Sequence, residues 1–194
     1  ITPAKLIFSV YICTPVNVFT MDSYSIIHAT EADIMVIHDM AEVVFRHTYR
    51  EIFSPEQMDY MMDWMYSPAN LKKQLEDGHV YFIAYRDGNP CAYVSIKPDG
   101  TGEDGKMLFH LHKIYVMPSE QGSGLGKKLF AQALSYASSV ACGRPASVEL
   151  NVNRNNPAVG FYSHLGLKIL RQGDFHIGNG FYMNDYIMGI DLNC

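Results

Sequence analysis

The chain has 194 residues, of which 48% are apolar and 18% are charged, and its formal net charge is −5. This length can bury a full hydrophobic core in one domain, and the apolar content excludes a largely disordered chain. The acidic balance, without a dense basic patch, argues against nucleic acid as a partner. No apolar run approaches the ~20 residues that a membrane span needs, so we expect no membrane partner.

The cysteines and the first residues bear on localisation and on the limits of the domain. Four cysteines occur without a CxxC pair and match no zinc spacing, which favours free thiols in the reducing cytoplasm and no bound metal. Residues 1–20 hold a short apolar stretch with a thin basic start and no clear signal-peptide cleavage site. We therefore expect residues 1–20 to be an extension outside the domain (a tag, an upstream segment or a misassigned start) and residues 21–194 to form a single domain.

The first half of the domain predicts one strand and then helices. Thr30 and Asp33 have the spacing of a capping box, and apolar residues then recur at helical spacing. Pro55 is typical of the first position of a helix, and Pro68 interrupts the helix that follows. The expected elements are a strand at 25–29 and helices from about 34 to 52, from 55 to the break at Pro68, and at 70–76.

The second half alternates strands and helices. An Asp-Gly-Asn turn at 87–89 predicts a hairpin, and we expect a polar loop at 99–105 and a glycine-rich link at 173–180. The expected elements are strands at 79–85, 91–96, 107–116, 147–152, 168–172 and 181–192 and helices at 124–141 and 156–165. This order predicts the α/β class with a mixed sheet, antiparallel at first and followed by a βαβ crossover.

The loop at 121–126 carries the strongest sign of a ligand. It reads QGSGLG and lies between a predicted strand and a predicted helix. Its glycines let backbone N–H groups point inward, and the start of the helix adds the positive end of its dipole. Lys127 and Lys128 stand in the first turn, where the dipole disfavours cations unless an anion is bound. The loop therefore predicts a cradle for a phosphate or pyrophosphate, and the alternative is a tight turn without a ligand.

Two common nucleotide-binding patterns fit this loop poorly. It lacks the G-x-G-x-x-G spacing of dinucleotide-binding folds and the acidic strand end that follows it. The Walker pattern needs Ser or Thr after its Gly-Lys pair, whereas Gly126-Lys127 is followed by Lys128. These departures disfavour a nucleotide-phosphate binder.

The residues of this region resemble the GNAT family of N-acetyltransferases. Gln121-x-x-Gly124-x-Gly126 matches the family signature Q/R-x-x-G-x-G/A, and Ile-Tyr-Val at 114–116 matches the strand end that precedes it.

A second motif lies downstream. Asn155-x-x-Ala158-x-x-Phe161-Tyr162, followed by Gly166, is similar to the family's N-x-x-A-x-x-F-Y…G-F segment. The resemblance covers residues from about 23 to 192, and two motifs in the family's order are a specific signal.

The resemblance implies the GNAT fold and acetyl-CoA as co-substrate. In that fold a central twisted, mostly antiparallel sheet of about 6–7 strands carries helices on both faces. Its strands at 107–116 and 147–152 would splay apart and admit the pantetheine arm beside the backbone of the first strand. The residues implied to hold acetyl-CoA are Ile114, Tyr115, Val116, Gln121, Gly122, Ser123, Gly124, Leu125, Gly126, Lys127 and Asn155.

The chemistry of acetyl transfer needs a proton donor and a proton acceptor. The resemblance implies that Tyr162 protonates the departing thiolate as general acid, and the alternative is a core aromatic residue. His112 is a candidate base because the histidine pKa lies near neutrality. His110 would share its face of the strand, and Glu149 on the neighbouring strand could act through a water. A chain of waters without a single base is a further alternative.

The acceptor pocket is expected between the two early helices. The candidate walls are Phe45, Tyr49, Phe53, Tyr60 and Trp64, although such residues also form cores. Residues 45–53 resemble the polyamine-acetylating branch of the family. Glu51, Glu56 and Asp59 would then attract a cationic amine.

These observations predict an N-acetyltransferase that transfers an acetyl group from acetyl-CoA to a primary amine of a small molecule or peptide, by direct attack in a ternary complex. The alternative is a catalytically silent CoA-binding module that acts as a sensor or scaffold. The resemblance also implies that the chain can form a homodimer.

Overall fold

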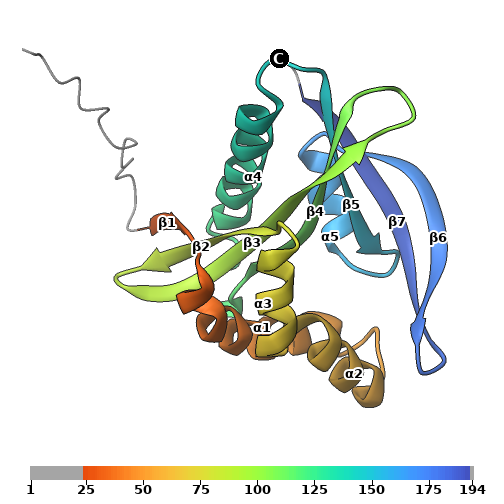
Figure 1. Ribbon diagram of the computed structural model, residues 1–194. Coiled ribbons are helices and arrows are strands. Elements are labelled where there is room, and N and C mark those ends of the chain that lie inside the picture. Colours follow the sequence, from red (N-terminus) through yellow and green to blue (C-terminus); the bar gives the residue numbers. More distant parts are fainter. Residues whose placement is uncertain (1–23, 193–194) are drawn as a thin grey trace, which may run out of the picture.

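The computed structural model describes residues 24–192, and it confirms the predicted mixed sheet (Figure 1). Seven strands pair in the order β1-β2-β3-β4-β5-β7-β6. Only β4 and β5 are parallel. The strands are β1 (Tyr24–His28), β2 (Val80–Arg86), β3 (Asn89–Thr101), β4 (Met107–Val116), β5 (Ala146–Asn153), β6 (Lys168–Gly178) and β7 (Phe181–Leu192). The extension expected at 1–20 lies outside the described residues.

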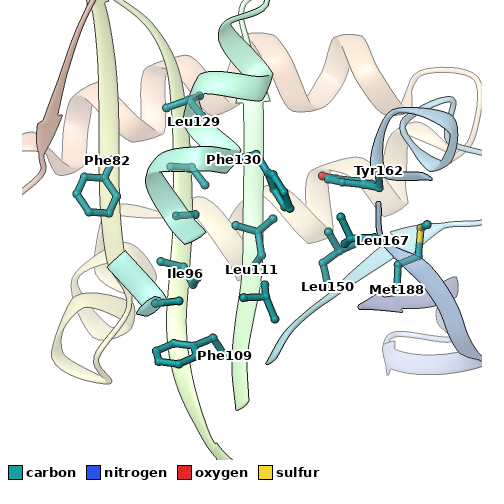
Figure 2. Close-up of a cluster of buried hydrophobic side chains, with 14 of the residues drawn as sticks. Phe82, Ile96, Phe109, Leu111, Leu129, Phe130, Leu150, Tyr162, Leu167 and Met188 are labelled. Carbon is teal, nitrogen blue, oxygen red and sulfur yellow. The ribbon is translucent and has the colours of Figure 1, made fainter. Parts of the chain in front are cut away.

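Helices cover both faces of the sheet (Figure 1). The α-helices are α1 (Ile34–Tyr49), α2 (Pro55–Tyr66), α3 (Pro68–Glu76), α4 (Leu125–Ala141) and α5 (Ala158–His164). Helices α4 and α5 pack with one face of the sheet in a large apolar cluster (Figure 2), and α1, α2 and α3 pack on the other face. Within residues 24–192, no helix is long and apolar enough to cross a bilayer.

The helix starts follow from the residues that cap them. Thr30 and Asp33 form the predicted capping box, and the Ser54 hydroxyl accepts from the amide of Gln57 at the start of α2. Helix α1 ends at Tyr49, a few residues before the predicted end, because a turn accepts two amides at the Tyr49 carbonyl. Helix α3 begins at Pro68 and not after it, since proline fits the first helical position.

Two predicted loops are shorter than the glycine content suggested. Strand β3 continues to Thr101, and β6 continues to Gly178 instead of ending near residue 172. Cross-strand hydrogen bonds to β7 hold this extension of β6. Asn179 and Gly180 form the remaining turn, and both have positive φ, 49° and 76°. Asn-Gly is the pair that suits a two-residue hairpin turn, so the predicted link at 173–180 is a β-hairpin.

A β-bulge on β4 determines which side chains of this strand face the site. Ser95 of β3 pairs with Lys113, while the next residue, Ile96, pairs with Leu111. His112 is therefore an extra residue on β4, and side chains on either side of it change faces. The pairing of β4 with β5 ends at His110. Beyond that residue, the two parallel strands separate.

Candidate active site

A groove between β4 and β5 contains most of the predicted acetyl-CoA site. Its volume is about 720 Å³, within the range of about 300–1,000 Å³ that is common for small-molecule sites. The predicted residues in its wall are Ile114, Tyr115, Val116, Gln121, Gly122, Gly124, Leu125, Gly126 and Lys127. Ser123 and Asn155 lie outside the wall.

The glycine-rich loop has an open surface toward the groove. Gly122 and Gly124 have φ values of 79° and 80°, in the left-handed region that favours glycine. A Cβ atom at either position would meet no other atom within 4 Å, so the space beside the loop is free. At Gly126 the reason for glycine is different. A Cβ atom there would lie 3.3 Å from the Phe161 ring, so glycine permits close packing of α4 on α5.

The loop also presents unpaired backbone donors. Helix α4 begins at Leu125 with no side-chain cap. Ser123 stabilises the loop, because its hydroxyl donates to the Glu120 carbonyl at 2.6 Å. Within residues 24–192, the loop amides that lack an acceptor are those of Gly122, Gly124, Gly126 and Lys127. Free amides at the positive end of a helix dipole form a site for a phosphate group.

The free edge of β4 continues this site. One edge of β4 pairs with β3 as far as Val116, whereas the other pairs with β5 only to His110. The backbone over 111–116 therefore faces the groove without a neighbouring strand. An extended amide-containing chain can bind such an edge as an added strand.

A second cavity, of about 470 Å³, lies on the side of α1, α2 and α3. Four expected acceptor-pocket residues line it, namely Phe45, Tyr49, Phe53 and Trp64. Tyr60 does not, because its hydroxyl donates to the Ile177 carbonyl at 2.5 Å. The residues that line both cavities are Tyr49, His112, Lys113, Tyr115 and Asn151. The groove and the second cavity therefore meet at the bulge of β4.

Tyr162 stands in the wall of the groove. The residue is 7% exposed, and its ring belongs to the apolar cluster shown in Figure 2. Its hydroxyl has no hydrogen-bond partner among the described residues. Burial, and then the nearby Tyr49, raise the pKa of Tyr162 well above its ordinary value. The hydroxyl therefore keeps its proton at neutral pH and can donate a hydrogen bond to a ligand in the groove.

Three histidines gather at the second cavity. The ring of His112 lies 4.4 Å from that of His110 and 4.2 Å from that of His79, centroid to centroid. Burial, followed by the neighbouring charge of Lys113, lowers the pKa of His79 to about 4. Burial and the adjacent histidines lower the pKa of His112 as well. Although His112 remains exposed, this direction keeps its imidazole neutral, and it weakens His112 as a base.

The structure places Glu149 apart from the two cavities. Its carboxylate binds the Arg171 guanidinium through contacts of 2.6 and 3.2 Å, and it lines a different depression of the surface. The carboxylates expected to attract a cationic amine also lie elsewhere. Glu51, Glu56 and Asp59 are exposed, and none of them lines the second cavity. The acidic residue in its buried wall comes from β7 instead.

Asn155 does not line the groove, although it was predicted to hold acetyl-CoA, whereas the next residue does. Asn155 is exposed, and its amide donates to the Asn153 side chain at 3.0 Å. Asn156 is buried and lines the groove. Its side-chain oxygen accepts from the Ala158 amide at 2.9 Å, where α5 begins. The groove residue of this segment is therefore Asn156.

Buried polar side chains concentrate at the two cavities. The described residues include five of them, Ser95, Lys113, Asn153, Asn156 and Asp185. Four line a cavity, and Ser95 lies 3.3 Å from His79, which lines the second one. Buried polar groups away from regular hydrogen bonding are costly to a fold. Their position here marks a functional site.

Lys113 and Asp185 were not predicted from the sequence. Lys113 is 7% exposed, and its ammonium donates to the Gln74 side chain at 2.6 Å. Burial lowers the pKa of Lys113 to about 7. Asp185 is 2% exposed, and burial is the main cause that raises its pKa. Perturbed titratable groups in a cavity are typical of active sites.

Comparison with known proteins gives a consistent result. The sequence model of the acetyltransferase (GNAT) family matches residues 39–167. The chain is similar in structure to the PaiA N-acetyltransferase of Thermoplasma acidophilum in complex with coenzyme A, with 20% identity, a TM-score of 0.69, and coverage of 86% of this chain and 98% of that one.

Two further structures have the same fold. The ribosomal-protein-S18-alanine N-acetyltransferase of Escherichia coli shares 16% identity with a TM-score of 0.64, over 88% of this chain and 95% of that one. A GNAT-family acetyltransferase from Streptococcus pneumoniae shares 21% identity with a TM-score of 0.59, over 88% of this chain and 99% of that one. These likenesses confirm the fold expected from the motifs.

Proposed function

Because the chain belongs to the acetyltransferase (GNAT) family, we propose that it transfers the acetyl group of acetyl-CoA to a primary amine of a small molecule. The protein is an acyltransferase, and acetyl-CoA is its co-substrate. The acceptor and the route of the reaction are the proposal. One observation supports it above the others: the groove and the second cavity share a wall at the bulge of β4. Two reactants can therefore meet there without a covalent enzyme intermediate.

The groove has the features that coenzyme A requires. The four free amides of the loop and the start of α4 suit its pyrophosphate, and the free edge of β4 suits its amide-containing arm. This arrangement directs the thioester toward the shared wall. The similar structure from Thermoplasma acidophilum binds coenzyme A, which supports the same use of the groove here.

Acetyl transfer in this geometry is a direct displacement. The amine nitrogen attacks the thioester carbonyl, a C–N bond forms, and the C–S bond breaks. We assign Tyr162 the transfer of its proton to the departing sulfur, because its protonated hydroxyl lines the groove without another partner. The acceptor amine must also lose a proton. Lys113, with its pKa near 7, is the strongest acceptor at the shared wall, whereas His112 is neutral but weakly basic.

A thiol-release assay tests this function. The protein is incubated with acetyl-CoA and a panel of small primary amines, and free coenzyme A is measured against a reaction without amine. We expect amine-dependent release. If calorimetry showed tight coenzyme A binding but no amine of the panel gave release above the control, the result would favour a silent CoA-binding module.

A further inference from the structure

Asp185 is a buried carboxylate without a cation to neutralise it. It lies on β7 and lines the second cavity, and only 2% of its surface is exposed. Asn151 donates to it at 3.4 Å, which is long for a hydrogen bond. Among residues 24–192, no lysine, arginine or histidine forms a salt bridge with it. The nearby Arg154 instead binds Asp174.

This arrangement is unfavourable for the fold alone. A carboxylate taken out of water needs a paired cation or several hydrogen bonds to offset the loss of hydration. Asn151 and the more distant Arg154 oppose the effect of burial on the Asp185 pKa only in part. Asp185 lines the second cavity, which shares wall residues with the groove. A cationic group of a ligand in this cavity would offset the cost of burying the carboxylate.

Lys113 is the other buried charged residue of the cavity, but it does not neutralise Asp185. Burial is the one cause that shifts the pKa of Lys113, and Lys113 does not contribute to the shift at Asp185. The two residues lie on β4 and β7, with β5 between them. Two regular strand spacings correspond to about 10 Å, and β4 and β5 separate beyond His110, so the two backbones are at least this far apart. Lys113 and Asp185 thus mark opposite sides of the cavity.

We propose that Asp185 binds a second ammonium group of the acceptor, so that the acceptor is a short alkane diamine or a similar small amine with a second cationic centre. This inference rests on the proposed function. The reacting nitrogen would lie at the shared wall near Lys113, and the second nitrogen would lie against Asp185. The cavity volume of about 470 Å³ suits a small molecule. The three histidines do not oppose a dication, because the pKa of each is lowered.

Paired substrates test the inference. Putrescine and n-butylamine share a carbon chain and differ in the second amine. We expect the wild-type protein to prefer putrescine in kcat/KM, and we expect Asp185→Asn to reduce this preference at least tenfold. Asp191→Asn is the matched control, because Asp191 lies on β7 but is exposed and outside both cavities. An unchanged preference in Asp185→Asn would overturn the inference.

Binding separates this inference from the proposed function. Calorimetry of putrescine with the coenzyme A-saturated protein needs no turnover. Binding that is at least tenfold weaker in Asp185→Asn, with Asp191→Asn unaffected, would support the diamine site even if no amine were acetylated. Equal binding by the two variants, or no binding by the wild type, would refute the site. Turnover of n-butylamine would still uphold the proposed function in that case.

Discussion

Replacing Tyr162 with phenylalanine isolates the proposed acid from the packing around it. The hydroxyl is the only group removed, and it makes no hydrogen bond with the described residues. The ring would keep its contacts in the cluster of α4, α5 and the sheet. A buried hydroxyl without a partner contributes little to stability. We therefore expect a change of less than about 1 kcal/mol in the free energy of unfolding.

The effect on turnover should be much larger. General acid catalysis typically contributes about 10²- to 10⁴-fold. We expect Tyr162→Phe to lower kcat at least ~10-fold, which corresponds to about 1.4 kcal/mol or more in the barrier. Coenzyme A affinity should remain within about threefold, because the loop amides and the β4 edge are untouched.

The assay is thiol release at saturating acetyl-CoA, with calorimetry for coenzyme A binding. Tyr136→Phe is the matched control, since Tyr136 is a half-buried tyrosine on α4 that does not line the groove. Unchanged kcat in Tyr162→Phe would remove the residue from the acid role. A parallel loss of coenzyme A affinity would indicate that it binds the co-substrate instead.

Three further predictions concern the loop and the two buried charges. Gly124→Val should weaken coenzyme A binding at least ~10-fold, because its side chain would enter the open space beside the amides. Gly143→Val has a similar positive φ at the far end of α4 and should leave affinity intact in the same titration. In the wild type, kcat/KM should rise with pH through about 7 as Lys113 loses its proton. A pH profile of Lys113→Met with the same rise would contradict that role. Burial raises the pKa of Asp185 above its value in the unfolded chain. The buried carboxyl therefore costs no stability at low pH, where it is protonated in both states. The cost grows as the pH rises from the unfolded pKa to the folded pKa. Asp185→Asn should therefore raise the free energy of unfolding near pH 7 by about 1 kcal/mol and raise the melting temperature, and an equal or lower melting temperature would count against it.

Much of the fold could be predicted from residue periodicity and from turn chemistry. The limits of β4 and the span of α4 follow directly from apolar patterning. The C-terminal hairpin departs from the prediction, because the glycines at 173–180 favour a link between the strands over their continuation. The decisive signal was Asn179-Gly180, which favours a two-residue turn. Pairing with β7 then keeps the glycine-containing end of β6 extended.

The two halves of the site differ in how far local sequence determines them. The phosphate cradle is formed by consecutive residues, so the spacing of glycines predicts it. The second cavity combines residues from α1, α2, α3, β4, β5 and β7, and no local pattern brings these together. The sequence nevertheless contains one indication that Asp185 is a site residue. It has the same strand parity as Met183 and Ile187, and a carboxylate at an inward position is unusual.

The bulge of β4 makes the shared wall depend on chain length as well as on residue identity. With His112 present, Lys113 and Tyr115 lie on the α1–α3 side of the sheet, and Ile114 and Val116 lie on the α4 side. Deleting a single residue there would restore an unbroken two-residue repeat and rotate every following side chain to the opposite face. The lysine amine would then be directed into the hydrocarbon interior beneath α4. Relatives that keep both sequence motifs but lack this insertion would have different side chains where the groove and the second cavity meet, and we expect them to differ in acceptor preference.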